Sequence, residues 1–176
     1  VLAVAEGLCV VLIDSACMAL ACAVQGWAQR SPEEPSTEAT VRGPKEGFVE
    51  SLRANTSMLR RRIADPRLHI EERRLGRVTR TLVATVYIQG IARPSIIQEL
   101  RSRLDKVDND SIQESGQLQD LIMDAPLSHF PTIARTERPD RIVGALLDGR
   151  IAIIVDGTPF VLIVPATFTM YLTTPE

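Results

Sequence analysis

The stretch "RIVGALLDGRIAIIVDGTPFVLIV" (141–164) carries three structural signals in a row. An apolar run with helical spacing ends at Gly149, and glycine commonly terminates helices. Two aliphatic runs follow, separated by Asp156-Gly157. Asp-Gly between apolar runs is one of the strongest short-range signals for a β-hairpin. The stretch therefore predicts a helix, a glycine cap and a buried hairpin, which together indicate an α/β fold.

The chain before this stretch alternates between helical and extended patterns. Pro44 and Glu46 are expected in the first turn of a helix, and Gly76 in a turn between two strands. We expect a small mixed β-sheet flanked by helices, ending in a C-terminal β-hairpin at the edge of the sheet. Helices are expected at 46–63, 94–106, 115–124 and 139–149, and strands at 68–75, 81–91, 132–137, 150–155 and 160–164.

The same pattern occurs a second time at the start of the chain. "VLAVAEGLCVVLIDSACMAL" (1–20) aligns with "VGALLDGRIAIIVDGTPFVL" (143–162), so that Asp14 matches Asp156. Both copies read as helix end, glycine, strand, Asp turn and strand. The pattern predicts that the first copy ends a preceding sister module of which the rest is missing. The alternative is a chance match between two buried hairpins, and both Asp residues are interpreted as turn formers first.

This interpretation divides the chain into three parts. Residues 1–27 are predicted to be the truncated end of a first α/β subdomain, with a hairpin turn at Asp14-Ser15. Residues 28–45 are polar, contain three prolines and are predicted to be a linker. Residues 46–176 are predicted to form a second α/β subdomain.

Composition limits the function classes. The chain has 176 residues, is 45% hydrophobic and has a formal net charge of −2, so it can build a core and gives no general case for nucleic-acid binding. Cys9, Cys17 and Cys22 are interpreted as reduced, buried core residues. The longest uncharged run, 157–175, is interrupted by prolines, so no membrane span is predicted. A longer parent chain with a membrane segment stays compatible with these observations.

Charge is unevenly distributed along the chain. Residues 53–80 contain nine Arg against three acidic residues, whereas residues 99–124 contain seven acidic residues against three basic ones. These regions are expected to complement each other within one chain or between subunits. A membrane-surface role for the arginines is the alternative, and the chain lacks the aromatic elements of a nucleic-acid site.

One group of charged residues is a candidate anion site. Two cations precede a predicted helix N-terminus, whose free N–H groups and dipole favour anions, and three arginines lie in that helix's last turn. The alternative is that the turn only positions the linker, or that it contacts another subunit. The candidate anion or subunit contacts are Arg42, Lys45, Glu46, Arg60, Arg61 and Arg62.

No catalytic or cofactor motif is present in the sequence. His69 and His129 lie far apart with no cysteine beside either, so no metal site is predicted. The P-loop, G-x-G-x-x-G and G-x-S-x-G patterns are absent. Asp140 is expected in the first turn of its helix, where a carboxylate is favoured. We therefore expect no enzymatic activity, no cofactor and no metal.

Three phrases carry a resemblance to a known family: "EEPSTEATVRGPKEGF" (33–48), "TERPDR" (136–141) and "VDGTPFVLIVPA" (155–166). With them the chain resembles, over almost its whole length, the A subunits of spore germination receptors, the GerA family. The departures are modest: Ser15-Ala16-Cys17 stands where family members are usually more polar, and the first subdomain is incomplete.

The resemblance implies a domain on the cytoplasmic side of the spore inner membrane, facing the spore core. It implies partners of the B and C subunit types and a homo-oligomer formed through the membrane-embedded parent protein. The expected function is to couple nutrient sensing to the opening of a membrane ion channel during germination. The alternative is a small-molecule module that binds a germinant in a cleft between two α/β subdomains.

Overall fold

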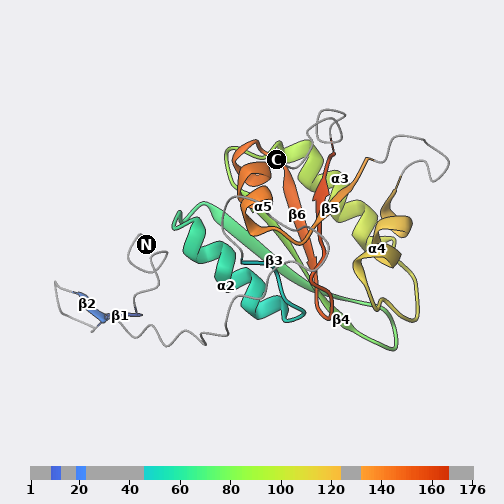
Figure 1. The fold of residues 1–176 in the computed structure, drawn as a ribbon, viewed down its shortest axis with the longest axis horizontal. Helices are drawn as coiled ribbons and strands as arrows, with labels where there is room; N and C mark the ends of the chain where they lie inside the picture. The colour runs from blue at the N-terminus through green and yellow to red at the C-terminus, as the bar shows by residue number, and fades with distance from the viewer. Residues whose placement is uncertain (1–8, 13–18, 23–45, 124–131, 167–176) are drawn as a thin grey trace.

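The computed structural model describes residues 9–12, 19–22, 46–123 and 132–166 (Figure 1). Near the N-terminus, β1 (Cys9–Leu12) pairs antiparallel with β2 (Ala19–Cys22), which places Cys9 opposite Cys22. The two strands of the predicted first hairpin are therefore confirmed, but Cys9 is exposed, where a buried core residue was expected. Its turn, predicted at Asp14-Ser15, lies outside the described residues, as does the predicted linker. The division into a remnant, a linker and a second subdomain stays a prediction.

The second sheet has five strands in the order β3-β4-β6-β7-β5. The α/β class is confirmed, but every described pairing is antiparallel, where a mixed sheet was expected. Two of the pairings are tight hairpins, which can only join antiparallel strands. The strands are β3 (Leu68–Leu75), β4 (Thr81–Ile88), β5 (Ala134–Thr136), β6 (Ile151–Val155) and β7 (Val161–Val164).

The hairpin β6–β7 is present, but the prediction that it forms the edge of the sheet is wrong. β4 pairs with β6 on one side, and β5 pairs with β7 on the other. Every residue of β6 and β7 is buried. Continuous aliphatic runs are typical of strands covered on both faces, which is the position of these two strands inside the sheet. The three-residue strand β5 occupies the edge instead.

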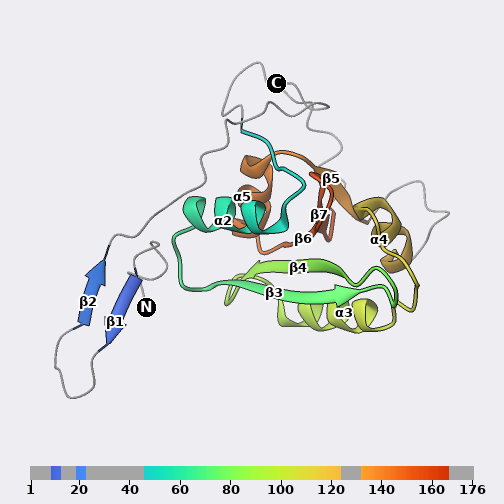
Figure 2. The same ribbon diagram turned by 90° about the horizontal axis from the view of Figure 1, so that it is seen from below.

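Helices cover both faces of this sheet (Figure 2). One core cluster joins α2 and α5 to alternate strand residues such as Ala84, Val86 and Ile154. The other joins α3 and α4 to the intervening residues, including Val83 and Ile153. Alternation along the strands thus gives each face its own aliphatic core. The helices are α2 (Leu52–Arg62), α3 (Pro94–Asp105), α4 (Ser115–Ile122) and α5 (Pro139–Leu147).

The start of α2 differs from the prediction. The helix begins at Leu52 with Ser51 as its N-cap, whereas a start at residue 46 was expected. The buried side chain of Asn55 bonds both backbone groups of Val49, so the preceding segment stays extended. Serine at an N-cap is favoured over a helix interior, and here it decides the boundary.

Gly149 closes α5 as predicted. Its φ of +81° lies in the left-handed region, and an added Cβ would stand 2.8 Å from the carbonyl oxygen of Ile91. A larger residue would therefore be both strained and too close to its neighbour. Among the described helices, none has the length and apolar character needed to cross a membrane.

Candidate functional site

A layer of polar side chains lies between β3 and α3. In a strand, alternate residues point to the same face, and His69, Glu71 and Arg73 share the face that α3 covers. The sequence "LHIEERRL" places them one after another on this face. Because β3 is the first strand of the sheet, the layer lies along its edge.

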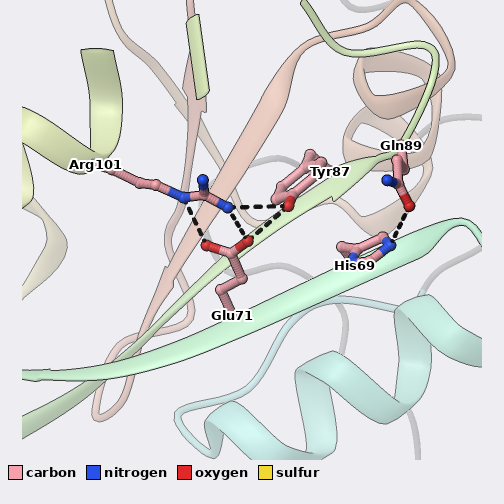
Figure 3. Close-up of polar contacts among 5 residues, drawn as sticks. All are labelled: His69, Glu71, Tyr87, Gln89 and Arg101. Atoms are coloured by element: carbon pink, nitrogen blue, oxygen red, sulfur yellow. Dashed lines mark hydrogen bonds and ion pairs between the residues drawn. The ribbon is translucent and has the colours of Figure 1, made fainter. Parts of the chain in front are cut away.

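Glu71 is the centre of this layer (Figure 3). Arg101 of α3 donates from Nε and Nη2 to the two carboxylate oxygens, with Nε 3.1 Å from Oε2. The hydroxyl of Tyr87 on β4 donates to Oε1 at 2.6 Å. The hydrogen bonds from Arg101 hold the pKa of Glu71 below its usual value of 4.5. Burial, followed by the contact with Glu71, raises the pKa of Tyr87.

His69 extends the layer toward the start of β3. Its ring stacks on Tyr87 with centroids 5.5 Å apart and an interplanar angle of 11°. Its Nε2 lies 2.7 Å from Oε1 of Gln89 (Figure 3). Thr85, the residue directly opposite Glu71 on β4, is 1% exposed, and its hydroxyl has no hydrogen-bond partner among the described residues.

This arrangement is suited to clamping rather than to acid–base chemistry. The Glu71 carboxylate is held ionised between a guanidinium and a phenol, so it is a poor proton acceptor near neutral pH. A bidentate arginine fixes the orientation of both partners. The contact thereby joins α3 to the two strands at the edge of the sheet.

Three further ion pairs show charge complementarity within the chain. Arg73 on β3 donates to Asp105 at the end of α3, at 2.7 Å. Arg77, in the β3–β4 turn, lies 2.8 Å from Asp110 and 3.6 Å from Asp108. Both arginines belong to the basic region and all three acids to the acidic region, so these members of the two regions meet in one molecule.

The structure brings together part of the candidate anion site. Arg62 contacts Glu46 at 2.6 Å and Arg61 lies 3.8 Å from it, so Glu46 joins the last turn of α2, not its first turn as expected. The half-buried Arg60 has no ion pair among the described residues. The role of these residues as anion or subunit contacts stays a prediction.

The remaining members of that group, Arg42 and Lys45, lie outside the described residues, as does His129.

Asp156 has a role beyond its turn. Its Oδ1 accepts a hydrogen bond from the backbone N–H of Leu52 at 2.9 Å, across 104 residues of sequence. The next residue, Gly157, donates its N–H to the carbonyl of Glu50 at 2.8 Å. The turn of the β6–β7 hairpin therefore caps the N-terminus of α2. The Asp-Gly signal predicted the turn but contains nothing that predicts this partner.

Asp140 lies in the first turn of α5, as expected, and pairs with Arg138 at 2.6 Å. Within the described part of the chain, no group of His, Cys, Asp and Glu is arranged to hold a metal ion.

The surface also has an apolar groove and a polar hollow. The groove has a volume of about 140 Å³ and lies between α3, α4 and the ends of β5 and β7. Its apolar lining includes Ile96, Leu100, Ile122, Ile133 and Val164, and the charged residues Glu99 and Arg103 also line it. The hollow, of about 450 Å³, is lined by Gln113, Glu114, Gln117, Gly157, Thr158 and Phe160.

Comparison with known proteins identifies the family. The model of the Bacillus/Clostridium GerA spore germination proteins matches residues 1–176. The chain is 52% identical over 158 residues to spore germination protein KA of Bacillus subtilis (90% of this chain, 29% of the relative). It is 48% identical over 171 residues to spore germination protein B1 of the same species (97% and 35%). The chain thus spans about a third of the length of these curated relatives.

A solved structure agrees with this match. The crystal structure of the N-terminal domain of the A subunit of the Bacillus megaterium spore germinant receptor GerK3 superposes with a TM-score of 0.57. The two chains are 52% identical, and the match covers 73% of this chain and 50% of the other. The chain belongs to the GerA family of spore germination proteins.

Proposed function

We propose that this chain couples nutrient sensing to the opening of a membrane ion channel during spore germination. It does so as a domain of a receptor A subunit, on the cytoplasmic side of the spore inner membrane. Its partners are B- and C-type subunits and further copies of the parent protein. In this proposal it has no enzymatic activity and acts through subunit packing.

The observation that carries the proposal is the family match over the whole chain. Its similarity to an A-subunit N-terminal domain supports the same assignment. The fold is compatible with a mechanical role, because two aliphatic cores and the Glu71–Arg101 clamp join the helices firmly to one sheet. A domain with such packing moves as a rigid body when a partner subunit changes its position at the interface.

The test is nutrient-triggered ion release from spores whose parent gene is deleted and then restored with variants. We expect Arg101→Gln, which weakens the clamp, to slow ion release at an unchanged receptor level, as measured by immunoblot. Arg53→Gln is the matched control: Arg53 is exposed on α2 and has no ion pair among the described residues. Ion release unaffected by deletion of the parent gene contradicts the proposal.

The alternative is a module that binds a germinant in a cleft between two α/β subdomains, and the apolar groove between α3 and α4 offers a second site within this one. Ligand binding stabilises the native state, and a ligand at 100 times its Kd adds about 2.7 kcal/mol. Thermal unfolding with amino acids, sugars, nucleosides or dipicolinate would then shift Tm upward by roughly 5–10 °C. A shift in this chain favours the alternative. A shift only in a longer chain with a complete first subdomain places the site between the subdomains.

A further inference from the structure

The two edges of the five-stranded sheet differ in length. β5, at one edge, has three residues, whereas β3, at the other, has eight and pairs with β4 on one side only. A long edge strand offers a row of unpaired backbone groups to another strand. In the described part of the chain no segment pairs with the outer side of β3.

The alternation of hydrogen-bonded positions along β3 shows which of its backbone groups point away from β4. Gln89 donates its N–H to the carbonyl of Arg67 at 2.8 Å, and these two residues are directly opposite in the β3–β4 register. In antiparallel pairs, hydrogen-bonded and non-bonded positions alternate. The odd-numbered residues of β3 therefore bond to β4, and Ile70, Glu72 and Arg74 direct their N–H and C=O groups away from the sheet.

The side chains at this edge carry opposite charges. Glu72 and Arg74 are both exposed and lie on the face of the sheet opposite to α3. Among the described residues Glu72 has no polar partner, and Arg74 bonds only the backbone carbonyl of Arg80, at 3.1 Å. Their neighbour Arg73, on the other face, is already paired with Asp105.

We propose that β3 pairs antiparallel with β3 of a second copy of this chain, with Glu72 opposite Arg74 of the other copy. A two-fold axis perpendicular to the sheet, passing beside Arg73, produces this register. It gives two Glu72–Arg74 pairs, each with two backbone hydrogen bonds. Cross-strand pairs of opposite charge stabilise a sheet. The interface is isologous, the commonest kind in homodimers.

Charge selects this register over its two neighbours. A shift of the axis by one residue toward the start of β3 places Glu72 opposite Glu72 of the other copy. A shift the other way places Arg74 opposite Arg74. Like charges directly opposite each other are destabilising. The order Glu-x-Arg along the outward-facing positions therefore fits one alignment of two identical strands.

The test uses sedimentation equilibrium of the full chain and of two charge reversals. We expect wild type to dimerise, and Glu72→Arg and Arg74→Glu each to weaken the dimer on the order of tenfold to a hundredfold. A mixture of the two variants restores it, because each Arg then faces a Glu. Circular dichroism checks that each variant is folded.

Two further variants separate pairing from net charge. Arg53→Glu changes the charge as much as Arg74→Glu but lies on α2, so its dimer constant stays at the wild-type value. Glu72→Pro removes an outward N–H, which edge strands tolerate, and abolishes the dimer without changing the fold. A wild-type chain that is monomeric up to its solubility limit overturns the proposal, as does a mixture of the charge reversals that stays monomeric.

Discussion

The two faces of the five-stranded sheet have aliphatic cores of similar composition, but the polar contacts that attach the helices to the sheet differ between them. On the α2–α5 face, contacts from side chains to the backbone hold the start of α2, and the ion pairs Arg62–Glu46 and Arg138–Asp140 involve no strand residue. Asp156 caps α2 from the β6–β7 turn, and Asn55 holds Val49. On the α3–α4 face, ion pairs join the helix α3 to the strand β3, as in Glu71–Arg101 and Arg73–Asp105.

The difference predicts different responses to the medium. Ion pairs that are partly exposed weaken in salt and when a carboxylate is protonated. Aliphatic packing and helix caps depend on these conditions far less. The β3–α3 ion pairs are thus expected to be more sensitive to pH and ionic strength than the aliphatic cores. Mutations can test the two aliphatic cores, the helix cap and the ion pairs separately.

The core should account for the largest effects, whichever face is changed. Leu146 of α5 is fully buried, and Leu104 of α3 is 1% exposed. Leu146→Ala and Leu104→Ala should each lower the free energy of unfolding by about 3 kcal/mol, because each leaves a cavity. Urea unfolding monitored by circular dichroism measures this. Leu147→Ala is the control: that side chain is 57% exposed, and its loss should cost under about 0.5 kcal/mol.

The two losses of free energy of unfolding should be similar. If they differed greatly while the control stayed unchanged, the two faces would not have equivalent cores.

The long-range cap should give an intermediate effect. Asp156→Ala should lower the free energy of unfolding by about 1 kcal/mol, because the N–H of Leu52 loses its acceptor. Asp156→Asn should retain most of the stability, since asparagine also caps helices and suits the same turn. Urea unfolding at low and high salt distinguishes a helix cap from an effect of the charge on Asp156. A cost that disappears in salt would show an effect of charge and not of capping.

Local signals in the sequence were sufficient for most elements of this fold. The extended pattern of 68–75, followed by the turn residue Gly76, predicted β3 at its observed bounds, and Gly149 closed α5 as predicted. The β6–β7 hairpin followed from Asp156-Gly157. Each of these depends on residues that are neighbours in the sequence.

The errors came from contacts between distant residues. The start of α2 was predicted too early because the extended segment before it is held by Asn55 and by Gly157, which lies more than a hundred residues away. A strand at 132–137 was predicted, but the position of β6–β7 inside the sheet depends on β5 pairing with β7, and no local pattern indicates which strands pair. The clamp combines residues of β3, β4 and α3, and no short motif contains all of them.

The clamp itself should give the smallest effect and the clearest dependence on pH. The folded-state pKa of Glu71 lies below 4.5, so its ionised form stabilises the native state. This contribution is complete above pH 4.5 and is lost as the pH falls through the folded-state pKa. Glu71→Gln should cost about 0.5 kcal/mol at pH 7, because the pair is partly exposed. The difference from wild type should shrink as the pH falls below 4.5.

Urea unfolding of wild type and Glu71→Gln at a series of pH values measures this difference, and Glu50→Gln is the matched control. Glu50 is exposed, and its side chain has no ion pair among the described residues. Its substitution should leave the free energy of unfolding at pH 7 at about the wild-type value. If Glu71→Gln kept the same deficit down to pH 3, the stabilisation would come from the shape of the side chain, and the contrast between the two faces would not be electrostatic.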